Sequence, residues 1–265
     1  MDDPRPTAAG MYDFYLGGTA NSPADRTAAE QIAKLIPEIG DAAWANRGFL
    51  QRAVTRLAGQ WGVRQFLDIG AGLPTRRNTH EVVADVRPDG RVVYVDVDRS
   101  AAARGSELLA DVPGAVMIHA DIREPDRILD HPQTRRLIDL TEPVGLLIVA
   151  VLQFVPDDDE PWRLVGRYLD ALAPGSYLVL SHGSGEHASE QLRQTATRIY
   201  ANTPTPPTDR SRTEIERFFR GLEIVPPYPG APPELTFAGL WGAEDPDAAD
   251  SDGSRLSYAA VGRKP

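Results

Sequence analysis

The stretch Arg64–Pro74 reads R-Q-F-L-D-I-G-A-G-L-P and decides the fold that we expect for the whole chain. A short apolar run, interrupted by Asp68, ends in Gly70-Ala71-Gly72. This pattern predicts a buried strand that ends in a tight turn, because glycine adopts positive φ angles easily and lets a ligand approach the backbone. Such turns lie at the carboxyl ends of strands in open α/β sheets, where nucleotides and nucleoside cofactors bind.

The composition is that of an acidic chain without cysteine. Its 265 residues carry a formal net charge of -10 and a pI near 5.0, and 42% of them are apolar, enough for a sizeable core. General nucleic-acid or membrane binding needs a basic surface, so neither partner is expected. Zero cysteines exclude disulfides and thiolate metal sites and fit a cytoplasmic protein. We expect no signal peptide, and the longest apolar run, Val144–Leu152, is about half as long as a membrane span.

Short β-branched runs alternate with segments of helical periodicity from Arg64 to Ser181. The alternation predicts βαβ units and a doubly wound parallel α/β sheet with helices on both faces. The strands that we expect are Gln65–Ile69, Arg91–Val95, Ala115–His119, Val144–Leu152 and Ser176–Ser181. The helices that we expect between them are Thr79–Val86, Ser100–Ala110, Pro125–Asp139 and Glu160–Leu172.

The chain before the first strand predicts a helical extension. Helical spacing of apolar residues predicts helices over Asp25–Ile36 and Ala45–Ala58. Before them, residues 11–18 read M-Y-D-F-Y-L-G-G, and three aromatic residues in four are unfavourable to expose. This segment either docks on the core or forms a lid over a ligand, hinged at Gly17-Gly18.

The chain after Ser181 predicts mixed structure. We expect a helix over Glu186–Tyr200, a proline-rich loop at 204–207 and a helix from the capping box at Ser211 through Arg220. Short strands are expected at Leu222–Val225, Leu235–Leu240 and Leu256–Val261, with the acidic segment Glu244–Asp252 as a solvated hairpin tip. No domain boundary is evident, so we expect one domain over 1–265, with an N-terminal helical lid (1–60), a cofactor-binding core (61–185) and a C-terminal part (186–265).

Three acidic residues lie at the carboxyl ends of successive predicted strands: Asp68 within the first, Asp96 after the second and Asp121 after the third. An acid at the end of the second strand can accept both hydroxyls of a ribose. Asp96 lies 24 residues beyond Gly72, close to the spacing of about 20 that this role needs. Taken singly, each is more often a helix-capping aspartate, but three at one sheet edge predict a nucleoside site.

The glycine turn differs from a dinucleotide fingerprint. In G-x-G-x-x-G the third glycine brings the helix N-terminus to a pyrophosphate. Thr75, preceded by Pro74, occupies that position. A pyrophosphate is thus poorly served, which favours S-adenosylmethionine (AdoMet) over NAD or FAD.

Several segments resemble class I AdoMet-dependent methyltransferases. They are F-L-D-I-G-A-G at 66–72, V-V-Y-V-D-V-D at 92–98 and H-A-D-I at 119–122. More closely, the chain resembles an actinobacterial S-adenosyl methyltransferase family, through M-Y-D-F-Y-L-G-G-T-A-N at 11–21, A-N-R-G-F-L at 45–50, Q-F-L-D-I-G-A-G-L-P-T at 65–75 and V-L-Q-F-V-P-D at 151–157. The resemblance implies a Rossmann-like, mostly parallel seven-stranded sheet with a C-terminal antiparallel hairpin.

The resemblance also implies roles for individual residues. Around the methionine and ribose it places Asp68, Gly70, Ala71, Gly72 and Asp96. Around the adenine it places Val97, Asp121 and Ile122. Along the methionine side, at the end of the fourth strand, it places Ala150, Val151 and Leu152. The sequence departs from the family at Thr19, where lysine is usual, and at Gln153, where histidine is common.

The predicted reaction is methyl transfer from AdoMet to an unidentified small-molecule acceptor, in which positioning supplies much of the catalysis. Residues expected at the substrate or in the lid are Tyr12, Tyr15, Gly17, Gly18 and His80. Candidate bases are His80, His182, Asp13, Tyr12 and Tyr15, each more simply explained as structural. No metal site is expected, since the acids of Asp157–Glu160 suit a helix N-terminus. A non-catalytic AdoMet-binding regulatory protein and an NAD(P)-dependent oxidoreductase remain as alternatives, and the sequence indicates no oligomeric state.

Overall fold

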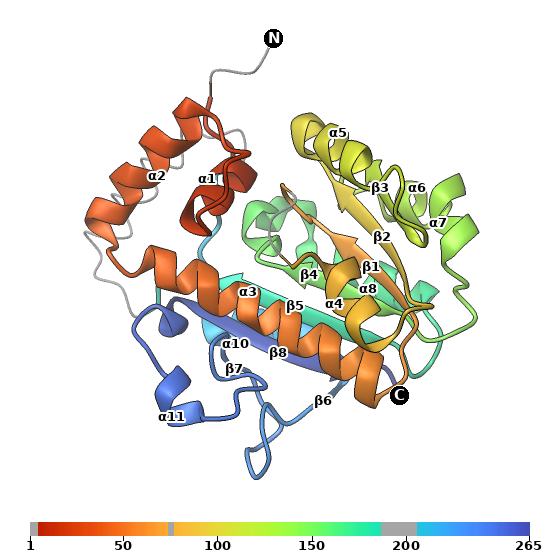
Figure 1. Ribbon diagram of the computed structural model, residues 1–265. Coiled ribbons are helices and arrows are strands. Elements are labelled where there is room, and N and C mark those ends of the chain that lie inside the picture. Colours follow the sequence, from red (N-terminus) through yellow and green to blue (C-terminus); the bar gives the residue numbers. More distant parts are fainter. Residues whose placement is uncertain (1–4, 74–76, 187–205) are drawn as a thin grey trace.

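A computed structural model describes residues 5–73, 77–186 and 206–265. At its centre is an eight-stranded sheet of order β3-β2-β1-β4-β5-β8-β6, with β7 also paired to β8 (Figure 1). Neighbouring strands from β3 to β5 are parallel, and β8 is antiparallel to β5 and β6. The strands are β1 (Gln65–Ile69), β2 (Arg91–Asp96), β3 (Ala115–His119), β4 (Gly145–Val149), β5 (Tyr177–Gly183), β6 (Glu223–Ile224), β7 (Thr236–Phe237) and β8 (Ser257–Arg263).

The sheet confirms the predicted fold class, and its eight strands fall at the eight predicted ranges, one strand more than the seven that the family resemblance implies. Strand β8 is seven residues long, and two short strands share its outer side: β6 pairs with its end and β7 with its beginning. The strand order reverses between β1 and β4. From β1 the chain proceeds to β2 and β3 on one side, and from β4 it proceeds to β5 on the other side, so the crossover connections run in opposite directions. In open α/β sheets this reversal leaves a crevice at the carboxyl ends of the strands, where ligands bind.

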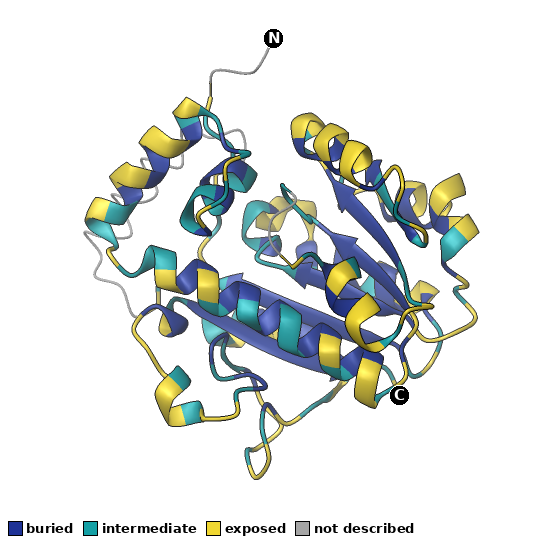
Figure 2. Ribbon diagram, viewed as in Figure 1, coloured by how far each residue is buried: buried dark blue, intermediate teal, exposed yellow. Residues whose placement is uncertain are grey.

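Helices cover both faces of the sheet, and their outer sides are exposed while the strands are buried (Figures 1 and 2). They are α1 (Ala8–Tyr15), α2 (Pro23–Leu35), α3 (Ile39–Thr55), α4 (Thr79–Val86), α5 (Arg99–Leu108), α6 (Pro125–Leu129), α7 (Pro132–Leu137), α8 (Pro161–Ala171), α10 (Arg212–Glu216) and α11 (Pro246–Ala249). A π-helical turn, η1 (Arg56–Gln60), extends α3, and 3-10 turns are η2 (Leu152–Phe154), η3 (Asp157–Asp159), η4 (Arg217–Phe219) and η5 (Ser254–Leu256).

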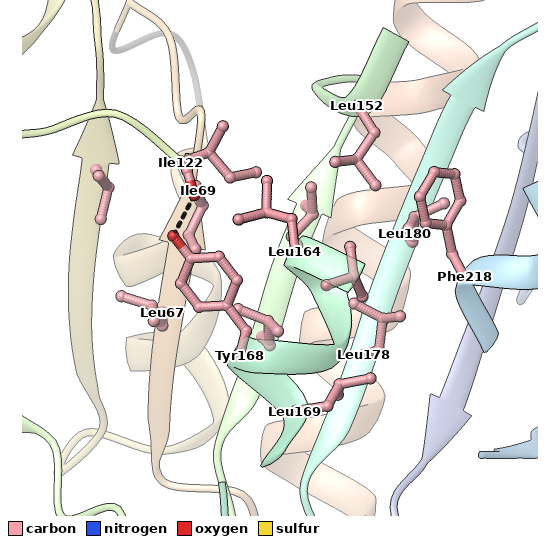
Figure 3. Close-up of a cluster of buried hydrophobic side chains, with 14 of the residues drawn as sticks. Leu67, Ile69, Ile122, Leu152, Leu164, Tyr168, Leu169, Leu178, Leu180 and Phe218 are labelled. Atoms are coloured by element: carbon pink, nitrogen blue, oxygen red, sulfur yellow. Dashed lines mark hydrogen bonds between the residues drawn. The ribbon is translucent and has the colours of Figure 1, made fainter. Parts of the chain in front are cut away.

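Two apolar clusters flank the sheet, and strand alternation assigns side chains between them. On the α8 face, Leu67 and Ile69 of β1 pack with residues of α6 and α8 (Figure 3). On the α3 face, Phe66 of β1 packs with residues of α3 and α4. Because side chains alternate, Asp68 lies on the α3 face together with Phe66.

Three predicted segments differ from the structure because of local backbone chemistry. The helix expected over 125–139 is split into α6 and α7, since Pro132 lacks a backbone N–H and its predecessor His131 is not helical. The strand expected to reach Leu152 ends at Val149, because Ala150 has a positive φ of 57°. The acidic segment 244–252 is not a simple hairpin tip, since α11 forms within it.

The N-terminal part contains one helix more than expected. Residues 8–15 form α1, whose N-cap Thr7 accepts a hydrogen bond from the Gly10 N–H. This helix and α2 enclose a small apolar cluster of Met11, Ala28, Ala29 and Ile32, separate from the two clusters along the sheet. Figure 1 shows α1 and α2 beyond the ends toward which β1 and β2 point.

Three predictions fall wholly or partly outside the described residues: the helix at 186–200 beyond its first residue, the first half of the proline-rich loop at 204–207, and the significance of Pro74 and Thr75. Within the described ranges, no helix is both long and apolar enough to cross a membrane.

Candidate functional site

The glycine turn after β1 is fixed on the end of β2. The N–H groups of Gly70 and Ala71 both donate to the Val95 carbonyl, at 2.7 and 3.1 Å. Gly70 has a φ of 72°, and a Cβ there would lie 2.3 Å from Cγ2 of Val151. Glycine is therefore required by both backbone conformation and space. The close approach brings the turn against the loop that follows β4, at the reversal of strand order.

Asp96 at the end of β2 is joined to this turn. Its carboxylate accepts hydrogen bonds from the N–H of Gly72 at 2.7 Å and from the N–H of Asp98 at 2.8 Å. Burial raises the pKa of Asp96, against these two hydrogen bonds. Beside it, the Val97 side chain is 53% exposed, which is unusual for valine next to a buried strand. The pair offers a buried acceptor and an uncovered apolar surface.

Asp68 lies on the same face, one strand away. It accepts a hydrogen bond from the Thr79 hydroxyl at 2.6 Å. Burial raises the pKa of Asp68 to about 6, although the Thr79 hydrogen bond and the positive charge of Arg47 both favour the ionised form, while Asp96 opposes it. Arg47, on α3, is itself buried. Asp68 thus has a guanidinium near enough to act on its charge, and only the carboxyl group was predicted from the sequence.

Asp121, the third acid of the series, is occupied differently. Arg123 donates to both of its carboxylate oxygens and also pairs with Asp159 of η3 at 3.2 Å. Burial raises the pKa of Asp121, but the hydrogen bonds and charge of Arg123 outweigh this and lower it below its ordinary value. The acid stays ionised, and Arg123 fixes its orientation.

Ile122 follows Asp121, and its backbone is held from α8. The Tyr168 hydroxyl donates to the Ile122 carbonyl at 2.7 Å, and the Ile122 side chain lies in the core of the α8 face (Figure 3). Leu152 is likewise buried in that core. Any contact of Ile122 or Leu152 with a ligand in the crevice would therefore be made by backbone atoms.

Ala150, directly after β4, has a backbone conformation that is unusual for a residue with a side chain. Its φ of 57° lies in the left-handed region. The Ala150 N–H donates to both the carbonyl and the hydroxyl of Ser181 on β5, at 3.1 and 3.0 Å. The conformation redirects the chain at the carboxyl edge, so that Val151 meets the glycine turn.

Arg210 holds the loop after β4 from the other face. This arginine is 1% exposed. It donates to the carbonyls of Leu152 and Val155 at 2.7 and 2.6 Å and pairs with Asp157 at 2.7 Å. Its Nη1 also lies 2.9 Å from Nε2 of His182. Three acids of the run are paired with arginines: Asp157 with Arg210, Asp159 with Arg123 and Glu160 with Arg163.

Helix α1 contacts α3 through Tyr12 and passes near the glycine turn at Ala9. Tyr12 donates its hydroxyl to the Ala43 carbonyl at 3.2 Å, and Arg47 lies over its ring at 5.7 Å. A Cβ on Gly72 would lie 3.8 Å from the Cβ of Ala9. The Tyr15 hydroxyl instead donates to Ala29 of α2. Of the two tyrosines, Tyr12 faces the body of the protein.

Gly17 and Gly18 form a well-defined turn. The N–H of Gly17 donates to Phe14 and that of Gly18 to Asp13, the Schellman pattern that ends helices. Gly17 has a φ of 71°, and a Cβ on Gly18 would lie 2.0 Å from the Asp13 carboxylate. Both glycines are therefore required by this turn, and their role as a hinge stays a prediction.

The sequence matches a known family over residues 1–265. That family is described as S-adenosyl methyltransferase. The chain belongs to it. The predicted resemblance is confirmed, and so are the class of enzyme and the cofactor AdoMet. The membership disfavours the dinucleotide-dependent oxidoreductase.

Solved structures agree with the family. The crystal structure of a predicted methyltransferase from Thermobifida fusca YX is 42% identical, with a TM-score of 0.89, and the match covers 99% of this chain and 96% of that one. A DUF574 family protein from Streptomyces avermitilis MA-4680 is 39% identical, with a TM-score of 0.90 and coverage of 100% and 99%. N-methyltransferase NodS from Bradyrhizobium japonicum WM9, solved with S-adenosyl-L-homocysteine, has the same fold at 15% identity, with a TM-score of 0.50 and coverage of 81% and 85%. No match is found among curated proteins.

The described residues of this S-adenosyl methyltransferase family member fit the chemistry of AdoMet. The cofactor has a ribose, an adenine and an amino acid that carries both charges. Asp96 is a buried hydrogen-bond acceptor, Val97 is uncovered, and Asp68 and Arg47 supply opposite charges. The backbone at Gly70 leaves no room for a side chain. A cofactor with these three parts matches this set of groups.

The five candidate bases are engaged elsewhere. Asp13 accepts three hydrogen bonds on one oxygen, from the N–H of Ala20 and from the N–H and side chain of Asn21. His182 accepts from Arg210, its Nδ1 lies 2.6 Å from the Gly183 carbonyl, and burial lowers its pKa to about 4.

The other three candidates are no better placed. The Nδ1 of His80 lies 2.8 Å from the Tyr94 hydroxyl, and burial lowers the pKa of His80. Burial raises the pKa of Tyr12, and both Tyr12 and Tyr15 donate to backbone carbonyls. Each of the five is thus explained by structural contacts.

Sequence reasoning missed several residues that shape the site: Asn46, Arg47, Thr79, Ser181 and Arg210. A signal existed for the first two, because they lie in the segment A-N-R-G-F-L that carries the family resemblance. Helical periodicity would place such polar residues outside, yet both Asn46 and Arg47 are buried. Two adjacent polar residues that are buried on α3 are therefore further candidates for the site.

Proposed function

We propose that this chain is an active methyltransferase that transfers the AdoMet methyl group to a small-molecule acceptor in the cytoplasm. The observation that carries the proposal is the joining of the glycine turn, Asp68 and Asp96 on the α3 face at the reversal of strand order. Helix α1 passes near the glycine turn at Ala9, and a site approached this closely by a helix suits a small acceptor better than a macromolecule.

In this proposal each part of AdoMet has its own residues. Asp96 accepts the ribose hydroxyls, and Asp68 and Arg47 receive the amino and carboxylate groups of the methionine part. The turn Gly70-Ala71-Gly72 passes beneath the cofactor. The adenine is lined by Val97, Asp121 and the backbone of Ile122, and the methionine side by Ala150, Val151 and the backbone of Leu152.

AdoMet supplies a methyl group on a positively charged sulfur, which a nucleophile displaces. The protein's part is then to orient both reactants and to exclude water. Since the five candidate bases are engaged in structural contacts, we propose an acceptor that is nucleophilic without a protein base. Tyr12 beside the methionine side offers a ring face to positive charge, as its contact with Arg47 illustrates.

Gln153 gives a clue to the acceptor. Its Oε1 is buried and has no hydrogen-bond partner within the described part of the chain. Leaving such a group unsatisfied costs about 1–3 kcal/mol. The residue follows Leu152 in the loop at the end of β4, so we propose that Oε1 accepts a hydrogen bond from an N–H or O–H of the acceptor.

Calorimetry and turnover test the proposal together. Purified protein should bind AdoMet and S-adenosylhomocysteine, and it should form S-adenosylhomocysteine when AdoMet is supplied with fractions of an actinobacterial metabolite extract. Lack of binding by folded protein would refute the cofactor assignment. Binding without product from any fraction would favour the non-catalytic regulatory protein. That alternative also agrees with the finding that the five candidate bases are engaged in structural contacts.

A further inference from the structure

The N-terminal helices meet the body of the protein partly through polar contacts. Their apolar residues Met11, Ala28 and Ile32 pack among themselves, apart from the clusters along the sheet. At Tyr12 the contact with α3 is instead a hydrogen bond and a ring stacked by Arg47. Polar contacts of this kind can break without exposing a large apolar surface.

A continuous chain of hydrogen bonds starts at Tyr12 and ends at Ala150. The Ala150 N–H donates to the Ser181 hydroxyl at 3.0 Å, and that hydroxyl donates to Oδ1 of Asn46 at 2.5 Å. The Nδ2 of Asn46 donates to the Tyr12 hydroxyl at 2.9 Å, which donates in turn to the Ala43 carbonyl at 3.2 Å. Asn46 and Ser181 are 4% and 0% exposed.

Asn46 is the residue in this chain of hydrogen bonds whose side chain both accepts and donates: its amide oxygen accepts from Ser181 and its NH2 donates to Tyr12. The Ser181 hydroxyl has one hydrogen, which it donates to the amide oxygen of Asn46, so that oxygen must face Ser181. The Asn46 NH2 group must then face the Tyr12 hydroxyl. All donors then point in one direction, an arrangement in which successive hydrogen bonds strengthen one another. Aspartate could accept from Ser181 but could not donate to Tyr12.

The end of the chain at Ala150 lies at the methionine side of the proposed cofactor site. Ala150 has a left-handed backbone conformation, held by the two hydrogen bonds to Ser181. Such conformations in residues with side chains are unfavourable by about 1–3 kcal/mol and persist only where the surroundings impose them. A change at Ser181 or Asn46 therefore reaches the backbone that lines the crevice.

We infer that Asn46 is a positioning residue that couples the placement of the N-terminal helices over the crevice to the backbone conformation at Ala150. With the chain intact, α1 stays against α3 and the methionine side is formed. Loss of the Asn46 amide releases α1 and lets Ala150 relax, which weakens cofactor binding from both sides. The effect on the cofactor rests on the proposed function, whereas the attachment of α1 does not.

Asn46→Leu tests this inference against a matched control, Gln65→Met. Gln65 is also a buried amide that bonds on both sides, to backbone atoms of Asp139 and Glu142, but it lies at the amino end of β1. Both variants remove a satisfied buried amide with little change of volume. Hydrogen exchange of α1, measured without ligand, and calorimetry with S-adenosylhomocysteine are compared at matched fractions of folded protein.

We expect the amides of α1 in Asn46→Leu to exchange at least tenfold faster than in wild type, with β2 still protected. Its affinity for S-adenosylhomocysteine should fall about tenfold, or about 1.4 kcal/mol. Gln65→Met should change neither. Unchanged α1 exchange in Asn46→Leu would overturn the inference, whatever the affinity.

Tyr12→Phe keeps the inference testable if Asn46→Leu does not fold. It removes the hydroxyl at the α1 end of the route and should loosen α1 in the same direction, so α1 protection equal to wild type would overturn the inference. If wild type fails to bind S-adenosylhomocysteine while α1 loosens as expected, the coupling of α1 to Asn46 stands and the proposed function falls.

Discussion

The two faces of the sheet differ at the carboxyl ends of the strands. Along β1 and β2 the side chains on the α8 face remain apolar to the end, as Leu67 and Ile69 of β1 illustrate. On the α3 face the same strands change character: Phe66 of β1 is followed by Asp68, and Tyr94 of β2 by Asp96. One face thus supplies stability over its whole length, and the other gives up apolar packing where a ligand can be bound.

The largest effect that this difference predicts is on stability. Leu146 of β4 is fully buried on the α8 face. Leu146→Ala should lower the free energy of unfolding by about 2–5 kcal/mol, because it removes apolar contacts and leaves a cavity. Denaturant titration measures the loss. Calorimetry on the folded protein should show an unchanged affinity for AdoMet, and a parallel loss of affinity would contradict the division between the faces.

Asp96→Ala should have the next largest effect, this time on binding. Its carboxylate is a buried acceptor on the α3 face. Removing a charge-assisted hydrogen bond should lower the affinity for AdoMet at least tenfold, or about 1.4 kcal/mol of binding free energy. Asp98→Asn is the control. Asp98 lies two residues after Asp96, and its Oδ1 caps the N-terminus of α5 by accepting from the Ser100 N–H. Equal affinities of wild type and Asp96→Ala would mean that the ribose lies elsewhere.

The protonation of Asp68 predicts a pH dependence. The pKa of Asp68 is raised to about 6 in the ligand-free protein, so its proton must leave before the carboxylate can pair with the cofactor's amino group. Affinity should therefore rise with pH up to about 6 and then level off, with a slope that approaches tenfold per pH unit below 6. Calorimetry between pH 4.5 and 7 measures it. Asp68→Asn should lack this slope, and an identical slope in both proteins would exclude Asp68 as its source.

The smallest effect is expected at Asp121. The Asp121 carboxylate already forms an ion pair with Arg123, whose side chain is 53% exposed to solvent. A hydrogen bond from the ligand to Asp121 should therefore add less binding free energy than one to Asp96. Asp121→Asn keeps the shape of the side chain and should weaken AdoMet binding by less than about threefold, the scale of a solvent-exposed charge pair. A competition assay with S-adenosylhomocysteine suffices to measure it. A loss larger than that of Asp96→Ala would reverse the ranking of the two acids.

The parallel core and the acids at its edge could be predicted from the sequence because their signals are local. Strands β1 and β3 have the predicted bounds, since β-branched runs flanked by turns mark them. Asp96 was found by its spacing from the glycine turn.

The route from Tyr12 to Ala150 could not be predicted in the same way. The bond between Ser181 and Asn46 joins residues 135 positions apart, and no periodicity records such a contact. The positive φ of Ala150 also left no signal, because alanine rarely adopts it. Helix α1 was missed because aromatic residues and Gly10 make it a weak helix former, and packing on α2 decides its fold.

A crystal structure with S-adenosylhomocysteine bound is the most direct test of the site on the α3 face. The expected result has the ribose hydroxyls on Asp96, the amino acid part between Asp68 and Arg47, and the N-terminal helices in place over it. A ligand bound away from the carboxyl ends of β1 and β2, or a ribose that does not contact Asp96, would contradict it.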